Sequence, residues 1–349
     1  MVRAAGVCLA LLLGLGLFLP IGCGGGKSTP VAELNVYNWE DYFAPNTLAD
    51  FEKEFGIEVN LQTFSDEEEM KAAVQSDPGK YDVIFADEST IELMSDLRLL
   101  APLDHAKIPN LTNIDPQFLN LPADPGNQFS VPYDWGTSGI AYNSRYVSGN
   151  IDSWGVLWDP RYEGHIGMLN NIYSVIGLTL KYLGYSLNST DPAQLEEARL
   201  KLLEQKPLIA GYLDTVSIQR GLASGEIWVA MEYNGDSLLA AQVNPDIRFV
   251  VPKEGADFYI DSIGVPRDSP HKDNAELFIN YLLRPDVQAG NNNYLNYASP
   301  NRNAIDAGLI DASDLGNPAI YPPRQGLELY QKPGAADPLY QRIWAELQR

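Results

Sequence analysis

Short apolar runs alternate with helical periodicity along the first hundred residues of the 349-residue chain. "LNVYNW" precedes "TLADFEKEFG", "IEVNLQTF" precedes "EEEMKAAVQS", and "YDVIFAD" precedes "TIELMSDLRLL". Alternation of this kind is typical of βαβ units, in which helices cover both faces of a largely parallel sheet. We expect the first helix to begin at Asn46 or Thr47 and to end just before Gly56. The chain is therefore predicted to be an α/β protein.

A second set of elements begins near Tyr142. Helices are predicted over 174–186 and over 192–206, the latter begun by Asp191, and a strand is predicted over 226–233. At roughly 150 residues per domain, the length also favours two domains. Further along, the pattern predicts a helix over 274–285, a loop over 291–301 and a C-terminal helix.

The first 22 residues have the features of an export signal. Arg3 is followed by an uncharged run to Leu19 and a short end of small residues. Cys23 follows, and this end resembles a bacterial lipobox, in which the cysteine becomes the lipid-modified first residue. Residues 23–33 are then expected to be a flexible tether, because "GGGKS" lacks the leading glycine and the flanking strand of a phosphate-binding loop. We expect an exported lipoprotein, periplasmic or at the cell surface.

Composition narrows the classes of partner. The formal net charge is −22, and loss of a signal segment whose single charge is Arg3 makes it −23. Such a chain does not favour nucleic acid or an anionic membrane surface. Two explanations of the negative net charge remain open: solubility alone, or the attraction of cations. Because the other cysteine, Cys8, lies in the signal segment, no disulfide or reactive thiol is expected in the mature domain.

Acidic and aromatic side chains gather where the predicted strands end. In an open parallel sheet, ligands bind beyond the carboxyl ends of the strands. Carboxylates bind ammonium groups through charge-assisted hydrogen bonds, and aromatic faces attract the same cations, so an aliphatic diamine or triamine would suit these ends. The alternative is structural: Asp41 and Asp87 as helix caps, Trp39 and Tyr259 as packing residues. The residues at these ends are Trp39, Glu40, Asp41, Tyr42, Asp87, Glu88, Ser89, Asp134, Glu232, Tyr233, Tyr259 and Asp261.

Several sequence blocks in a fixed order resemble the polyamine-binding periplasmic proteins of ABC importers, of the spermidine and putrescine type. They include "VYNWEDY", "VPYDWGTSGIAYN", "SWGVLWDPRYEGHIGML", "VPKEGADFYIDSIGVP" and "NYASPN". The resemblance covers essentially the whole mature chain. It implies a type II periplasmic-binding-protein fold of two three-layer α/β lobes joined by hinge strands. Lobe 1 would comprise 34–138 plus 261–307, and lobe 2 would comprise 139–260 plus 308–349.

The same resemblance assigns ligand contacts by position. Asn171 and Ser174 stand where spermidine-type members carry an acidic pair, and Tyr330 stands in place of a glutamine. Asp87 stands where serine is frequent. The charge of the acidic pair, absent at Asn171 and Ser174, would have to come from the acids Asp87, Glu232 and Asp134. The matched contacts are the aromatic and phenol residues Trp39 and Tyr42, the acid Asp41, Tyr233 and Tyr259 at the positions of sandwiching tryptophans, the amine-binding carboxylate Asp261, and Tyr297.

The implied function is capture of a polyamine between the lobes and delivery to a membrane permease and its ATPase. We expect a monomer without cofactor, metal or catalysis, opening and closing about crossings near 136–139 and 260. The alternatives are a receptor for another cationic or zwitterionic amine, a metal receptor suggested by "YLNY" at 294–297, a sensing or adhesive lipoprotein, and a carboxylate-pair hydrolase. The histidines His105, His165 and His271 are scattered and have no nucleophile beside them.

Overall fold

The computed structural model describes residues 32–64 and 67–349. The predicted signal segment, Cys23 and most of the predicted tether lie outside the described residues. Ala32–Arg349 forms one compact unit. Within this described part, no helix combines the length and apolar character needed to cross a bilayer.

The N-terminal third alternates strands with helices as predicted. The first strand begins at Ala32, two residues before the predicted start of lobe 1. The first helix begins after Asn46, and its end is fixed by Gly56, whose φ of 68° is left-handed and whose N–H donates to the Glu52 carbonyl. The elements are β1 (Ala32–Trp39), α1 (Thr47–Phe55), β2 (Ile57–Phe64), α2 (Glu67–Ser76), β3 (Val83–Asp87), α3 (Glu88–Asp96), three short 3₁₀ turns between His105 and Phe118, and β4 (Ser130–Asn143).

The second set of elements begins after β4. Asp191 caps its longest helix by accepting a hydrogen bond from the Ala193 N–H at 2.7 Å, as the sequence predicted. The elements are η4 (Trp154–Trp158), η5 (Pro160–Tyr162), β5 (Ile166–Leu169), α4 (Ile172–Tyr182), α5 (Pro192–Gln205), β6 (Ile209–Leu213), α6 (Thr215–Ser224), β7 (Val229–Tyr233), α7 (Asn234–Val243) and β8 (Ile247–Val250).

The remaining chain returns to the first set of elements and then crosses back. It comprises β9 (Asp257–Gly264), α8 (Lys272–Leu282), α9 (Pro285–Leu295), α10 (Arg302–Asp306), α11 (Ala312–Leu315), β10 (Glu328–Leu329), η6 (Gly334–Ala336) and α12 (Asp337–Leu347). Ile320 is buried with the core around β1, whereas Tyr340 in α12 is buried with the core around β5.

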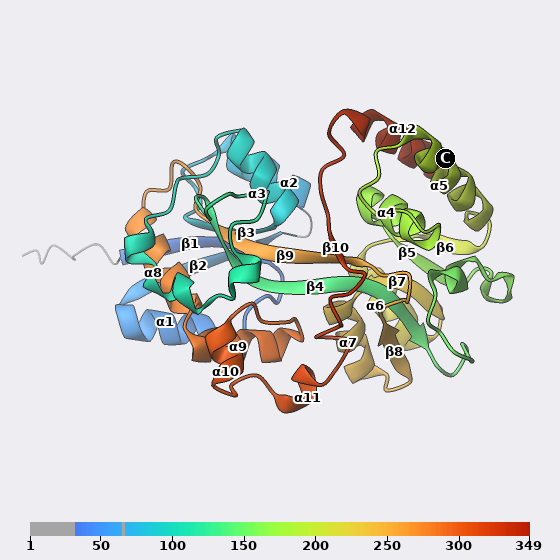
Figure 1. Cartoon of the computed structure of the whole chain (residues 1–349). Helices are drawn as coiled ribbons and strands as arrows, with labels where there is room; N and C mark the ends of the chain where they lie inside the picture. Colours follow the sequence, from blue (N-terminus) through green and yellow to red (C-terminus); the bar gives the residue numbers. More distant parts are fainter. Residues whose placement is uncertain (1–31, 65–66) are drawn as a thin grey trace, which may run out of the picture. The chain divides into compact units, whose positions relative to one another are not determined.

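Two long antiparallel strands, β4 and β9, join the two halves of the sheet (Figure 1). The strand order is β2-β1-β3-β9-β4-β7-β5-β6, and β1, β2 and β3 are mutually parallel, as are β5, β6 and β7. β4 pairs with β9 up to Thr137 and with β7 from Ser138 onward. The chain therefore passes from one half to the other between these two residues.

Each half of the sheet carries helices on both faces. In β3, Val83 and Phe85 belong to the core shared with α1 and α8, whereas Ile84 and Ala86 belong to the core shared with α2 and α3. Alternate residues of a strand point to opposite faces, so this continuous apolar run serves both layers. The other half has its own core around β5 and β7, packed by α4, α5, α6 and α12. Two three-layer α/β lobes, the predicted fold class, are confirmed.

The loop predicted over 291–301 is wrong in its first half, because α9 continues to Leu295. Pro285 occupies the first turn of this helix, where its missing N–H costs nothing. Asn291 is fully buried, and its Oδ1 accepts hydrogen bonds from the Ala44 N–H at 2.8 Å and the Thr47 hydroxyl at 2.6 Å. These tertiary contacts offset the poor helix propensity of the asparagine run. Asn296, with a φ of 59°, then ends the helix.

Replacing Gly290 in the middle of α9 by alanine is expected to stabilise the protein. A Cβ atom at this position would meet no heavy atom within 4 Å, and the backbone φ is ordinary. Alanine loses less backbone entropy on folding than glycine, which is worth about 0.5–1 kcal/mol in a helix. Urea unfolding of Gly290→Ala should show a higher midpoint with an unchanged slope, and a lower midpoint would contradict the expectation.

Candidate functional site

Three aspartates lie in a row across adjacent strands. Asp87 at the end of β3 is paired in register with Asp261 of β9, which is paired in turn with Asp134 of β4. Residues paired in this way point to the same face of a sheet. The register of β4 shifts between Pro132 and Asp134, and this irregularity brings Asp134 opposite Asp261. The carboxyl groups of three strands thus gather on one face.

A single phenol connects two of these carboxyl groups. The Tyr42 hydroxyl lies within hydrogen-bonding distance of the Asp261 Oδ2 atom and 3.2 Å from the Asp134 Oδ1 atom. The Tyr133 hydroxyl donates to the Tyr42 carbonyl at 3.3 Å and holds the turn that follows β1. Asp134 is fully buried and its Oδ2 atom has no hydrogen-bond partner, whereas Asp261 is 8% exposed.

Tyrosine rings continue this surface toward the second lobe. Tyr259 lies two residues before Asp261 and therefore on the same face of β9. Its ring meets that of Tyr233 at the end of β7, with centroids 5.2 Å apart, and that of Tyr297, with centroids 6.3 Å apart, both edge to face. The Tyr297 ring lies 6.1 Å from that of Tyr42. All four tyrosines remain partly exposed.

Two glycines make room for these rings. A Cβ atom at Gly136 would lie 2.4 Å from the Tyr259 hydroxyl, and one at Gly235 would lie 2.4 Å from the Tyr297 ring. Real Cβ contacts are essentially never this short, so any other residue would displace the tyrosine. Gly136 lies in β4 just before the crossing between lobes, and Gly235 lies in the first turn of α7. The rings therefore pack directly on backbone.

The second lobe contributes two further polar groups. Asn171 caps α4 by accepting from the Tyr173 and Ser174 N–H groups at 3.1 Å, and its Nδ2 atom donates to the Tyr233 hydroxyl at 3.3 Å. Asp236 of α7 accepts from Gln219 at 2.5 Å and from the Tyr297 hydroxyl at 3.4 Å. The contacts described so far join one set of side chains, here termed the acid–tyrosine cluster: Tyr42, Asp134, Tyr233, Asp236, Tyr259, Asp261 and Tyr297.

Burial keeps the acids of this cluster from ionising freely. It raises the pKa of Asp261 to about 7, with the charge of Asp87 adding to the effect, and raises the pKa of Asp236 to about 6. Burial, and then the charge of Asp261, raise the pKa of Asp134 well above its usual range. None of the ion pairs among the described residues involves these three aspartates. A guest that supplies positive charge would relieve this arrangement.

The ligand-free protein is expected to lose stability as the pH rises from about 4 to 7. An acid whose pKa is higher in the folded than in the unfolded state binds more protons when folded, so the free energy of unfolding falls as pH rises through the window between the two values. For Asp236, whose pKa rises from 3.8 to about 6, the effect is on the order of 3 kcal/mol, since one pKa unit corresponds to about 1.4 kcal/mol. Urea unfolding of Asp236→Asn should show a gain in stability over the original protein at pH 8 and a much smaller gain at pH 4, near the unfolded pKa. An equal change at both values would contradict the origin of the effect.

Four predicted residues lie beside the cluster. Asp87 caps α3, accepting from the Thr90 N–H at 2.7 Å and from the Ser89 hydroxyl at 2.9 Å. Its pairing with Asp261 nevertheless keeps its charge close to that residue. Asn171 and Ser174 lie at the start of α4, where Asn171 reaches Tyr233. A binding role for these four residues remains a prediction.

Three other predicted residues lie outside the acid–tyrosine cluster. Trp39 ends β1 and packs on Phe64, with ring centroids 4.5 Å apart, and its Nε1 atom is buried without a partner. Asp41 is exposed in a turn with a φ of 56°. Glu232 precedes Tyr233 in β7 and so faces the opposite side of the sheet, where its carboxylate accepts from the Tyr233 N–H at 2.8 Å.

Sequence inspection missed Asp236, Asn234 and the packing role of Gly136. Asp236 lies three residues beyond the end of β7, inside the first turn of α7, so inspection that stops at the strand end overlooks it. Asn234 accepts from the Thr137 N–H at 3.1 Å and lies 3.5 Å from the Tyr259 hydroxyl. Asn234 and Asp236 both lie in the block "EYNGD", within one helical turn after the end of the strand.

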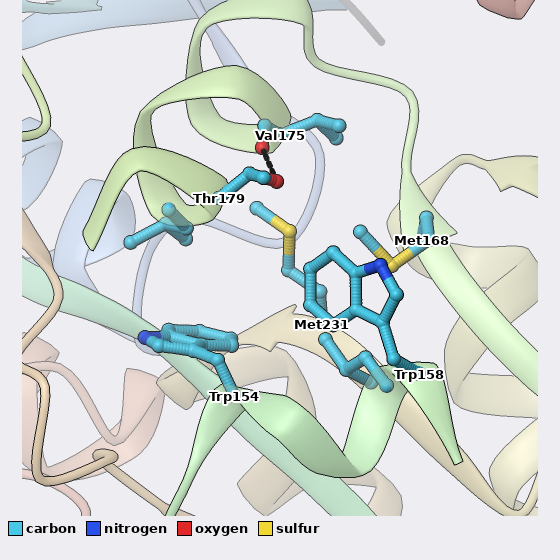
Figure 2. Close-up of a pocket in the computed structure, with 8 residues that line it drawn as sticks. Trp154, Trp158, Met168, Val175, Thr179 and Met231 are labelled. Carbon is cyan, nitrogen blue, oxygen red and sulfur yellow. Dashed lines mark hydrogen bonds between the residues drawn. The ribbon is translucent and has the colours of Figure 1, made fainter. Parts of the chain in front are cut away.

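A pocket elsewhere in the second lobe has a different character. Figure 2 shows Trp154, Trp158, Met168 and Met231 converging on it from η4, β5 and β7, beside Thr179 of α4, whose hydroxyl donates to the Val175 carbonyl at 2.7 Å. The lining carries no charged group and leaves no room for a water molecule. This pocket is an imperfection of the hydrophobic core and offers nothing to a polar ligand.

Metal binding receives no support from the described residues, in which no group of three or more His, Cys, Asp or Glu side chains could hold an ion. "YLNY" at 294–297 does not form a ligand set, since Tyr294 is exposed on α9 while Tyr297 belongs to the acid–tyrosine cluster.

Comparison with known proteins gives consistent matches over nearly the whole chain. Residues 46–315 match the family model described as bacterial extracellular solute-binding protein. The spermidine/putrescine-binding periplasmic protein of Escherichia coli (strain K12) is 31% identical over 334 residues, which cover 94% of this chain and 95% of that protein. The putrescine-binding periplasmic protein of the same organism is 35% identical over 310 residues, covering 83% of each chain.

A solved structure shows the same fold. It is that of a spermidine/putrescine ABC transporter substrate-binding protein from Streptococcus pneumoniae, in complex with calcium and HEPES. Its TM-score is 0.81 at 34% sequence identity, and the match covers 91% of this chain and 100% of that one.

Proposed function

This chain belongs to the family of bacterial extracellular solute-binding proteins, and from that premise we propose that it captures a polyamine of the putrescine or spermidine class for an ABC importer. Relatives at 31% and 35% identity are named for binding these amines. The Streptococcus pneumoniae protein of the same fold is named as an ABC transporter substrate-binding protein. The proposed role requires no bond to be made or broken.

The observation that carries the proposal is the meeting of acids and tyrosine rings to which no lysine, arginine or histidine among residues 32–64 and 67–349 forms an ion pair. Asp261 and Asp134 lie at one end and Asp236 at the other, with the Tyr297 ring between Tyr42 and Tyr259. An alkyl diamine would lay its methylene groups along the rings and direct its two ammonium groups to the acids. Each charge-assisted hydrogen bond contributes about 1.5–3 kcal/mol, and each ring about 0.5–2 kcal/mol.

The amides and hydroxyls near α4 favour a shorter amine. Asn171 and Ser174 carry no charge, so the acid that the second lobe contributes to the cluster is Asp236. A diamine needs two anionic ends, whereas a triamine needs a third. We therefore propose that putrescine or a similar diamine binds more tightly than spermidine.

Closure of the two lobes would complete the site. Tyr42, Asp134 and Asp261 belong to the first lobe, whereas Tyr233 and Asp236 belong to the second, and the two groups meet through Tyr259 and Tyr297. A ligand that touches both groups together stabilises the closed state, because it binds that state better than the open one. Bending would be concentrated where β4 changes partner, between Thr137 and Ser138, and beside it in β9 near Ile260. We keep the predicted lobe boundaries at 138/139 and 260/261, which lie beside these points.

Delivery to a membrane permease and its ATPase follows from the transporter role. An anchor on Cys23, joined to the domain by the tether, would keep a monomeric receptor at the membrane surface. A lipidated Cys23 would be found by mass spectrometry of the protein purified from membranes.

Isothermal titration calorimetry tests the function. Putrescine, cadaverine and spermidine would be titrated into the domain beginning at Ala32, at pH 8 and at two salt concentrations, with maltose and glutamate as uncharged and anionic controls. We expect saturable binding of the diamines in the micromolar range or tighter, weakened less than tenfold by salt because the charges are buried. Binding of a control solute with no response to any amine would contradict the proposal.

A further inference from the structure

Asp134 stands out among the acids of the cluster. Its side chain is fully buried, yet its Oδ2 atom has no hydrogen-bond partner, and its Oδ1 atom shares the Tyr42 hydroxyl with Asp261. A buried carboxylate oxygen without a donor is costly, because the lost hydration is not replaced. A ligand or a proton would remove the cost.

We propose that Asp134 and Asp261 form a carboxyl pair that holds one shared proton when the site is empty and exchanges it for the ammonium group of the bound amine. This inference rests on the proposed function, because it concerns the same site and the same class of ligand. In this proposal, Asp134 is a residue that determines specificity for a fully protonated amine.

The groups that face the pair from every neighbouring element favour such sharing. Tyr42, from the turn after β1, bridges the two carboxyls, and Tyr297, after α9, and Tyr259, in β9, face them with neutral phenols. Asp87 of β3 and Glu88 of α3 are the remaining acids nearby, and the Glu88 carboxylate accepts from the Ile260 N–H at 2.9 Å. In the described part of the chain, no lysine, arginine or histidine offsets the raised pKa of either aspartate. Two carboxyl groups that share one phenol repel each other when both are ionised, so a cation is needed for both to lose their protons.

The exchange is balanced in charge and atoms. The empty pair carries one proton and one negative charge. When the ammonium group enters, that proton leaves to the solvent, and the two carboxylates then accept N–H donors from the ligand. The amine keeps its own proton, because its pKa resembles the value near 10.4 of a lysine side chain. Release of the proton makes binding tighter as the pH rises, by up to about tenfold for each pH unit while the pair remains protonated.

Calorimetry in buffers of different ionisation enthalpy measures this proton directly. Putrescine would be titrated at pH 7.5 in phosphate and in Tris, and the dependence of the apparent enthalpy on the buffer gives the number of protons released. Asp236, with a pKa of about 6, is mostly ionised at this pH and contributes little. We expect release of more than half a proton per ligand bound. For Asp134→Asn, which keeps the shape and a bond to Tyr42, we expect less than a quarter.

The pH dependence of affinity separates a binding role from a structural one. Asp134→Asn should weaken putrescine binding about tenfold at pH 8.5 and much less at pH 6.5, where the original protein must first lose its proton. Glu58→Gln, exposed on β2 and equal in charge change, is the control and should leave affinity and proton release unchanged. The proposal of a proton-sharing pair would be overturned by an equal loss of affinity at both pH values, or by binding to the original protein without proton release. Failure of the original protein to bind any amine would overturn the proposed function as well.

Discussion

Replacement of Asp261 by asparagine is expected to weaken putrescine binding by about 100-fold. Asp261 is the carboxyl group on which the row of aspartates centres, and it shares a phenol with Asp134. The substitution keeps the shape of the side chain but removes a charge-assisted hydrogen bond, worth about 1.5–3 kcal/mol, and leaves the ammonium group facing an amide that also carries N–H donors. Titration calorimetry at pH 8 would measure the loss, with circular dichroism to verify the fold.

Asp257→Asn is the matched control for this substitution. Asp257 lies four residues earlier in β9, on the same face and equally buried, but its Oδ1 atom accepts from the Ser138 N–H at 3.1 Å, a bond that asparagine retains. We expect its affinity to stay within about threefold of the original. Equal losses in both variants would show that burial of an acid in β9, and not contact with the ligand, decides binding.

Gly235→Val is expected to lower the affinity for putrescine at least 30-fold, although it leaves every acidic residue unchanged. A Cβ atom here would lie 2.4 Å from the Tyr297 ring, which in turn bonds Asp236 of the same helix through its hydroxyl. The larger side chain would hold Tyr297 away from α7 and so disfavour the state in which both lobes contact the ligand. Because the dissociation constant Kd rises as the binding-competent fraction falls, a penalty of about 2 kcal/mol for closure accounts for the loss.

Small-angle scattering distinguishes this cause from local damage. The original protein should contract on adding putrescine, whereas Gly235→Val should contract only at much higher ligand concentration. Gly290→Ala, a helical glycine with open space around it, should bind and contract like the original. Normal affinity in Gly235→Val would show that Tyr297 does not rest on α7 in the bound protein.

Much of the fold follows from local signals that tertiary contacts reinforce. The unbroken apolar run of β3 predicts a strand buried on both faces. Gly56 marks a helix end through a left-handed backbone, and Asp191 marks a helix start through its side-chain cap. The end of α9 could not be predicted in this way, because the helix depends on hydrogen bonds between Asn291 and the distant residues Ala44 and Thr47.

The site was predictable where strand ends alone define it. Tyr233 was found because it ends the strand β7, whereas Tyr259 and Asp261, which the same rule placed at a strand end, lie inside the antiparallel strand β9. Glu232 shows the limit of that rule, since adjacent residues of a strand face opposite sides and only one of the pair can point to the cluster. Asp236 was missed because its position depends on how α7 begins, and the proximity of Asp134 to Asp261 depends on an irregular register that the sequence does not reveal.

A crystal structure of the putrescine complex at pH 8 tests the central claim most directly. It should place one ammonium nitrogen within about 3 Å of carboxylate oxygens of Asp261 and Asp134, with the alkyl chain against Tyr259 and Tyr297 and the other nitrogen near Asp236. Ligand density outside the acid–tyrosine cluster, or an amine that contacts none of these three acids, would contradict the account.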